Sequence, residues 1–275
     1  MASDGGFKTA VAAAWDSGAR LLPRSPALTV LYFHAVTAEH GRAFEAQIAY
    51  LKRTSSIVSA AYEGPLDTLR PNVAVTFDDA FRSVRDHALP VLIEHNIPVT
   101  VFVPTGWTGR EPAWSRHDKW DGGEVVMSLA ELAALPPNLV TLGSHSVDHL
   151  HLSRLTDEAI EDQLARSRAT LEGALGRPVD LLSLPYGDYD KRVVELAVRV
   201  GYRFVFSDRP QMLRQGGKGP LRGRTAVDPT DDLRTFALKS RGAFAWMPAA
   251  VRVKAVLNGE LQALSPGWRW QQRYH

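Results

Sequence analysis

Two short segments of the chain carry side chains that could form a metal site beside a base. Thr76-Phe77-Asp78-Asp79 ends one apolar run, and Gly143-Ser144-His145-Ser146-Val147-Asp148-His149 follows another. Two imidazoles and one carboxylate suit zinc, cobalt or nickel, and they leave coordination positions open for water and substrate. A divalent metal lowers the pKa of its bound water, and a second carboxylate nearby can accept the released proton. These residues therefore indicate hydrolysis by an activated water.

Each pattern also has a plainer interpretation. If the segment is helical, the four-residue spacing of His145 and His149 places both imidazoles on one side, but two surface histidines can share that spacing. Adjacent acids such as Asp78 and Asp79 often only begin a helix. Two carboxylates this close repel each other, so a metal ion would be needed to keep both ionised. A third polar segment, Leu184-Pro185-Tyr186-Gly187, favours the functional interpretation, because it also follows an apolar run.

Apolar runs alternate with helical patterns along most of the chain. We expect strands at 28–33, 73–77, 99–103, 140–142, 181–184, 204–206 and 224–227, and helices at 42–53, 82–95, 157–175 and 190–200. A capping box at Ser128 and Glu131 begins a further helix. This alternation predicts parallel strands joined by right-handed crossovers. In a barrel of this kind the functional groups lie at the carboxyl ends of the strands, where all three polar segments fall.

The three segments, in this order, resemble the NodB-homology polysaccharide deacetylases of carbohydrate esterase family 4. The resemblance covers roughly residues 28–240 and implies a distorted (β/α) barrel of about seven parallel strands. It implies that Asp79, His145 and His149 bind a divalent metal, with zinc expected ahead of cobalt or nickel. It also implies that Asp78 is the general base.

The same resemblance gives roles to the third segment. Tyr186 matches the residue whose backbone amide helps to hold the tetrahedral oxyanion, and Pro185 and Tyr186 would contact the substrate. The implied reaction is hydrolysis of an N-acyl group, in the first place N-acetyl, from an amino sugar in a polysaccharide or glycan precursor.

Three positions depart from the family pattern. Ser183 stands where many members have an arginine that orients the base, and no substitute for that arginine is evident in the sequence. Ala80 follows the two acids where a glycine is usual. The late histidine that protonates the leaving amine is absent, because no histidine lies between His151 and His275.

His34 is our candidate for the missing acid. The run Val30-Leu31-Tyr32-Phe33-His34 predicts a strand that delivers His34 to the same face. It is similar to the apolar-Tyr-x-His start of exopolysaccharide-type members, as if the last strand had moved to the front. A structural histidine that caps the strand end is the alternative interpretation.

The segment 104–127 is a long loop with Trp107, Trp114 and Trp120. Loops of this length are often functional. We expect Trp107 and Trp114 to stack on sugar rings of the substrate. The alternative is that the indoles only pin the loop to the barrel.

Composition sets broader limits on the protein. Its 275 residues suit a single domain, with a helix at 7–22 before the barrel and a helical extension at 241–275 after it. With 32 basic and 30 acidic residues, the net charge of +2 gives no reason to expect nucleic acid as a partner. The absence of cysteine excludes disulfides and thiolate metal sites.

We see no export signal and no transmembrane segment. We therefore expect a cytoplasmic protein with possible peripheral contact at the inner membrane. Its expected substrate is an amino-sugar glycan or a lipid-linked saccharide.

Two rival functions use the same residues. A degenerate member could bind saccharide without hydrolysing it, and an active enzyme could deacylate another amide, such as a formamido sugar or a non-sugar cyclic amide. The retained Asp78 favours an enzyme, because a binding module needs no base beside its metal. An unrelated α/β barrel would require Asp79, His145 and His149 to lie far apart.

Overall fold

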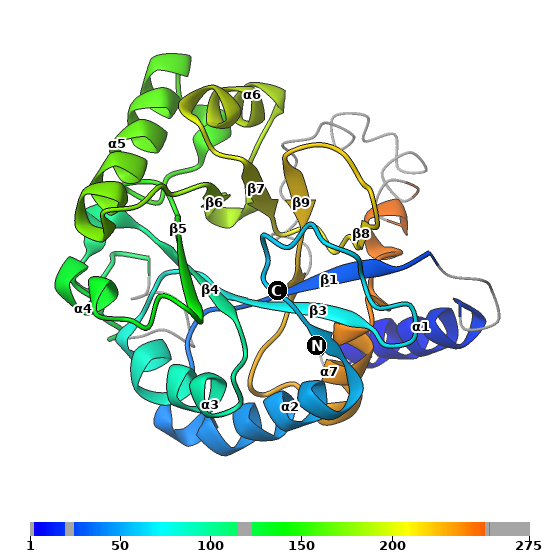
Figure 1. The fold of residues 1–275 in the computed structure, drawn as a ribbon. Coiled ribbons are helices and arrows are strands. Elements are labelled where there is room, and N and C mark those ends of the chain that lie inside the picture. Colours follow the sequence, from blue (N-terminus) through cyan, green and yellow to red (C-terminus); the bar gives the residue numbers. More distant parts are fainter. Residues whose placement is uncertain (1–2, 20–24, 115–122, 251–252, 254–275) are drawn as a thin grey trace.

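A ring of parallel strands surrounded by helices forms the body of the protein (Figure 1). The computed structural model describes residues 3–19, 25–114, 123–250 and 253. Along the ring, hydrogen-bonded neighbours follow the order β10-β1-β3-β4-β5-β6-β7-β9, and every pair on this path is parallel. The strands are β1 (Ala27–Phe33), β3 (Asn72–Phe77), β4 (Val99–Val103), β5 (Val140–Ser144), β6 (Leu181–Ser183), β7 (Phe204–Ser207), β9 (Leu221–Gly223) and β10 (Thr225–Ala226).

One segment joins the two ends of this sheet. Only Arg224 separates β9 from β10, yet β9 pairs with β7 while β10 pairs with β1. If β9 and β10 are counted as one interrupted strand, the barrel has seven parallel strands, which confirms the predicted fold. Two further strands escaped prediction because each has only two residues: β2 (Ser56–Ile57) beside β3, and β8 (Leu213–Arg214) antiparallel to β1.

Helices cover the outside of the ring (Figure 1). They are α2 (Gly41–Thr54), α3 (Leu89–Glu94), α4 (Leu129–Ala133), α5 (Asp157–Leu175), α6 (Lys191–Val200) and α7 (Leu233–Ser240). The predicted bounds of α5 match the structure, because Thr156 caps its first turn and Gly176 ends it with a φ of 63°. The predicted helix at 82–95 contains a π-helical segment, Val84–Ala88, directly before α3. Pro90 near the start of α3 has no N–H to continue regular α-helical bonding.

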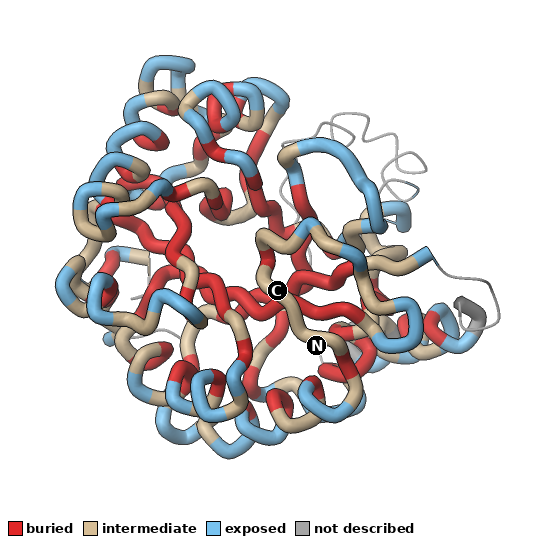
Figure 2. Tube along the Cα trace, in the orientation of Figure 1, coloured by how far each residue is buried: buried red, intermediate tan, exposed pale blue. Residues whose placement is uncertain are grey.

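Alternate residues of each strand face two different cores. On β1, Leu31 and Phe33 pack outward in the large core under the helices, whereas Leu28 and Val30 point into the barrel. Because the side-chain period of a strand is two, Tyr32 and His34 continue the inward set. Figure 2 shows that the strands from β3 to β7, and β1 beside them, are almost entirely buried. Inward positions at the carboxyl ends of the strands therefore meet inside the mouth of the barrel.

The N-terminal helix α1 (Ser3–Ala19) begins earlier than the predicted 7–22 and packs beside α7 (Figure 1). Ala12 shares a small core with Leu238 and Phe244, and Asp16 forms an ion pair with Arg241 at 3.1 Å. Residues 20–22 and most of the predicted extension 241–275 lie outside the described residues. Of the helices that are described, none combines the length and the apolar character required to cross a bilayer.

Candidate active site

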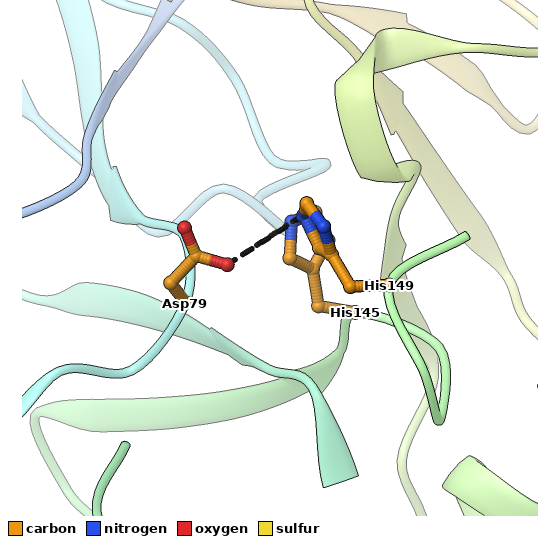
Figure 3. A group of neighbouring side chains, drawn as sticks. All are labelled: Asp79, His145 and His149. Carbon is orange, nitrogen blue, oxygen red and sulfur yellow. Dashed lines mark hydrogen bonds and ion pairs between the residues drawn. The ribbon is translucent and has the colours of Figure 1, made fainter. Parts of the chain in front are cut away.

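Asp79, His145 and His149 converge on one point at the mouth of the barrel (Figure 3). The two Nε2 atoms lie 3.1 Å apart, and Asp79 Oδ1 lies 3.9 Å from His145 Nε2 and 3.6 Å from His149 Nε2. Ligand atoms about 2.0–2.2 Å from one tetrahedral zinc ion are separated by roughly 3.4 Å. The donor atoms therefore fit a single divalent ion, and all three side chains are buried.

A loop, and not a helical turn, brings the two imidazoles together. Ser146 and His149 have left-handed φ values of 63° and 57°. Two side-chain hydrogen bonds fix this loop: Ser146 N donates to Ser144 Oγ at 3.1 Å, and His149 N donates to Ser146 Oγ at 3.1 Å. The expectation of a helical turn was wrong about the local backbone, although the Nε2 atoms of the two rings do come together.

The residues after β3 are bent in the same way. Asp79 and Ala80 have φ values of 64° and 51°. A left-handed conformation costs a residue with a Cβ atom about 1–2 kcal/mol, and glycine avoids that cost. The structure thus explains why a glycine at position 80 is common in the resembling family. Such strain is typical of functional sites, where surrounding contacts hold it in place.

Burial and hydrogen bonding prepare the imidazoles for a metal. The Ser183 carbonyl oxygen lies 2.8 Å from His145 Nδ1, so Nδ1 carries the proton and Nε2 has its lone pair free. Burial lowers the pKa of His145 to about 4 and the pKa of His149 well below 6.5. Both rings are therefore neutral at neutral pH, as metal ligation requires. Asp148 contacts neither ring: its carboxylate accepts a hydrogen bond from Gln163 Nε2 at 2.6 Å.

Arg224 supplies the positive charge beside the base, and it is the substitute for the arginine missing at Ser183 that was not evident in the sequence. Its Nη1 and Nη2 donate to the two carboxylate oxygens of Asp78, each at 2.7 Å. Nη2 also donates to Ser183 Oγ at 2.7 Å. The small serine leaves room for a guanidinium that arrives from the break between β9 and β10. An arginine at an inward position of the predicted strand 224–227 was the available signal.

This buried ion pair sets the charge of Asp78. Burial alone would raise the pKa of the carboxyl, but the Arg224 guanidinium and then His145 outweigh that effect and hold the pKa well below its usual range. Arg224 is 1% exposed and Asp78 is 4% exposed, so little solvent screens the pair. Asp78 is thus a carboxylate at neutral pH even before any metal binds.

Aromatic rings pack around the ligand His149. Trp114 stacks on His149 with ring centroids 4.0 Å apart, and Trp107 meets Trp114 edge-on at 5.3 Å. Tyr186 meets His149 edge-on at 4.5 Å and follows the buried Pro185. All four residues predicted to bind substrate therefore lie at the site, while Trp120 falls outside the described residues.

His34 lies at the same end of the barrel. It directly follows β1, and its ring meets Tyr32 edge-on at 5.7 Å. A positive charge on its ring would lower the pKa values of Asp78, His145 and His149. A hydrogen bond from Asp78 N to Phe33 O, 2.9 Å long, ties the ends of β1 and β3 together.

Asp208, at the end of β7, is a buried acid that the sequence analysis missed. Within the part of the chain that the structure describes, neither of its carboxylate oxygens has a hydrogen-bond partner. Burial raises the pKa of Asp208 to about 7, although Arg224 and Arg209 act in the opposite direction. Its carboxyl group packs against Gly187, where a Cβ atom would lie 2.1 Å from the Asp208 carboxyl carbon. The signal was an acid two residues after the predicted strand 204–206.

We expect Arg224→Met to lower the free energy of unfolding by about 3–5 kcal/mol, because it leaves a buried carboxylate without its counterion. Adding Asp78→Asn should recover much of this loss, since no buried charge then remains. Urea unfolding of the two variants and the parent measures both effects. Equal losses in the single and double variants would show that the charge of Asp78 is not the cause.

We expect Asp208→Asn to stabilise the metal-stripped protein at pH 8 and to have little effect near pH 4. The pKa of Asp208 is raised from an ordinary 3.8 to about 7, so only the unfolded chain ionises this carboxyl between those values, and native stability falls as pH rises. The gain at pH 8 is at most about 4 kcal/mol, at 1.36 kcal/mol per pKa unit. Urea unfolding across this pH range measures it, with the exposed Asp162→Asn as control. A gain that does not change with pH would contradict the assignment.

Known proteins are similar to this chain in sequence and in fold. The chain is 22% identical over 207 residues to the putative polysaccharide deacetylase YxkH of Bacillus subtilis, covering 71% of this chain and 70% of that protein. It is 25% identical to the peptidoglycan-N-acetylglucosamine deacetylase PgdA of Listeria monocytogenes, over 48% of this chain but only 25% of PgdA. Among solved structures, IcaB from Ammonifex degensii superposes with a TM-score of 0.66 at 26% identity, covering 81% of this chain and 99% of IcaB.

The sequence profile of the polysaccharide deacetylases matches residues 66–205, which run from before β3 to β7 and include Asp78, Asp79, His145, His149 and Tyr186. A match over half of the chain establishes the family that its motifs resembled. The protein belongs to the polysaccharide deacetylase family.

Proposed function

We propose that the protein is a metal-dependent hydrolase that removes an N-acyl group, in the first place N-acetyl, from an amino sugar in a polysaccharide or glycan precursor. One observation carries the proposal. The Asp79–His145–His149 donor set lies beside a second buried carboxylate, Asp78, that is ionised and held by its own counterion. Family membership supports the same reaction.

Each residue has a distinct task in this reaction. A bound divalent ion would acidify water and polarise the acyl carbonyl. Asp78 accepts the proton of the attacking water, and Arg224 keeps that carboxylate in place. The Tyr186 backbone amide donates to the oxygen that becomes negative as the water adds, which is worth a few kcal/mol in a dry site. His34 gives a proton to the departing amine, so that the products are a carboxylic acid and a free amino sugar.

The aromatic residues suggest how the sugar is held. Trp114 and Tyr186 both contact the ligand His149, Trp107 packs on Trp114, and an indole face can pack on the apolar face of a pyranose ring. PgdA is named for N-acetylglucosamine in peptidoglycan. We therefore propose N-acetylglucosamine polymers or their lipid-linked precursors as the first substrates to test.

Arg224 weakens the case for a degenerate saccharide-binding protein. That alternative rested in part on the arginine missing at Ser183. Arg224, which comes from another part of the sheet, binds the Asp78 carboxylate and also donates to Ser183 Oγ. Other amides, including formamido sugars, remain compatible with the same residues and form the second group of substrates to test.

We expect metal-stripped protein to release amine from N-acetylglucosamine oligomers only after zinc, cobalt or nickel is added back. Asp78→Asn should lower kcat by about 100-fold or more, the usual contribution of a general base, while zinc affinity stays within a few-fold. His145→Ala should abolish zinc binding itself. Amine assays and calorimetry separate the two effects. Oligomer binding without turnover in the presence of any of the three metals would favour the saccharide-binding alternative.

His34→Ala should impair cleavage only where the leaving group needs a proton. We expect a loss of about 100-fold or more in kcat on an N-acetylglucosamine oligomer, but little loss on 4-nitrophenyl acetate, whose phenolate leaves unprotonated. Asp78→Asn should fail on both substrates. If His34→Ala cleaved the oligomer at the parent rate, the acid assignment would be wrong.

A further inference from the structure

Tyr186 has a strained backbone at the centre of the site. Its φ of 57° and ψ of 15° are left-handed, and it sits between Pro185 and Gly187 in the turn after β6. A residue with a Cβ atom is disfavoured in this conformation. Such a residue keeps it only where its surroundings fix it. The contacts around the Tyr186 ring should therefore control the direction of its backbone.

Two histidine rings hold the Tyr186 ring, and both come from the loop after β5. His149 meets it edge-on, with centroids 4.5 Å apart and planes at 64°. His151 stacks on it, with centroids 4.2 Å apart and planes at 23°. His149 belongs to the donor set for the metal, whereas His151 has no part in the proposed reaction.

Hydrogen bonds tie the segment that carries His151 to the turn that carries Tyr186. Asp188 Oδ2 accepts hydrogen bonds from Ser153 N at 3.1 Å and from Ser153 Oγ at 2.7 Å. Asp188 N donates to Pro185 O at 3.0 Å. His151 Nδ1 lies 3.7 Å from the same Asp188 oxygen, beyond hydrogen-bonding distance. The segment 151–153 and the turn 185–188 are thus joined through Ser153 and Asp188.

The geometry points to His151 as a positioning residue: stacked on Tyr186, in a segment that Ser153 ties to Asp188, it holds the Tyr186 turn so that the backbone amide faces the acyl oxygen. The inference rests on the proposed function, which assigns that amide its task. A direct metal role for His151 does not fit, because its Nδ1 faces Asp188 and the donor cluster found among the described residues consists of Asp79, His145 and His149.

Kinetics of three variants test the inference. His151→Ala should lower kcat 10- to 100-fold on the N-acetylglucosamine oligomer, because a misplaced oxyanion donor acts mainly in the transition state. The KM and the zinc affinity should stay within about three-fold. His151→Phe keeps a stacking ring and should restore kcat to within a few-fold, and Asp188→Asn should give an intermediate loss.

Several results would overturn the inference. An unchanged kcat in His151→Ala would remove the positioning role. A rise in KM alone would make His151 a substrate contact, and a loss of zinc binding would make it part of the metal site. Failure of His151→Phe to recover would show that the ring stack is not the feature that matters.

A second readout does not depend on activity. Glycine adopts the left-handed conformation without support, so His151→Ala should lower the urea midpoint clearly in the parent but much less in a Tyr186→Gly background. Equal shifts in both backgrounds would overturn the link between His151 and Tyr186. If the parent releases no amine from any oligomer, the proposed function fails. The comparison of urea midpoints in the two backgrounds would still show whether His151 supports the Tyr186 backbone.

Discussion

The buried pair of Asp78 and Arg224 connects the chemistry of this protein to the closure of its barrel. Two groups of opposite charge lose their hydration inside the mouth, and the bidentate contact at 2.7 Å to each oxygen makes their burial tolerable. Arg224 occupies the single position between β9 and β10, where the sheet passes from β7 to β1. The counterion of the base is therefore also part of the seam that closes the ring.

Around this pair, the strands end in loops with unfavourable backbone angles. Asp79, Ala80, Ser146, His149 and Tyr186 all have positive φ values between 51° and 64°. A regular continuation of each strand would carry these side chains away from one another. The rigid parallel ladder beneath them, with its two cores, supplies the stability that offsets the strain. The barrel is thus a rigid scaffold that holds a few residues with left-handed backbone angles close together.

Much of this arrangement could be predicted from local signals in the sequence. The long helix α5 could be placed to the residue because Thr156 and Gly176 mark its ends, and the alternation of strands and helices predicted the barrel. The three metal donors could be named because parallel strands bring their carboxyl ends together. The expectation that a helical turn joins His145 and His149 was wrong. Ser146 and His149 adopt left-handed φ values, which their residue types do not indicate.

For other contacts the sequence marked a residue but not its partner. Arg224 lies 146 residues from Asp78 in the sequence, so their meeting depends on which strand closes the ring. The unpartnered carboxyl of Asp208 is recognisable only once the end of β7 is seen to be buried. The stack of His151 on Tyr186 likewise requires the relative position of two loops that follow neighbouring strands.

The position of Arg224 between β9 and β10, the last strands of the barrel in the sequence, also affects how the chain folds. Contacts between residues so distant in sequence form slowly, because a long loop must close before they contribute. Until β9 and β10 are in place, a partly assembled barrel would bury Asp78 as an uncompensated charge. That cost disfavours compact intermediates in which the ring is still open, so the base helps to make folding cooperative. The carboxylate that serves the reaction thereby also acts against an incomplete fold.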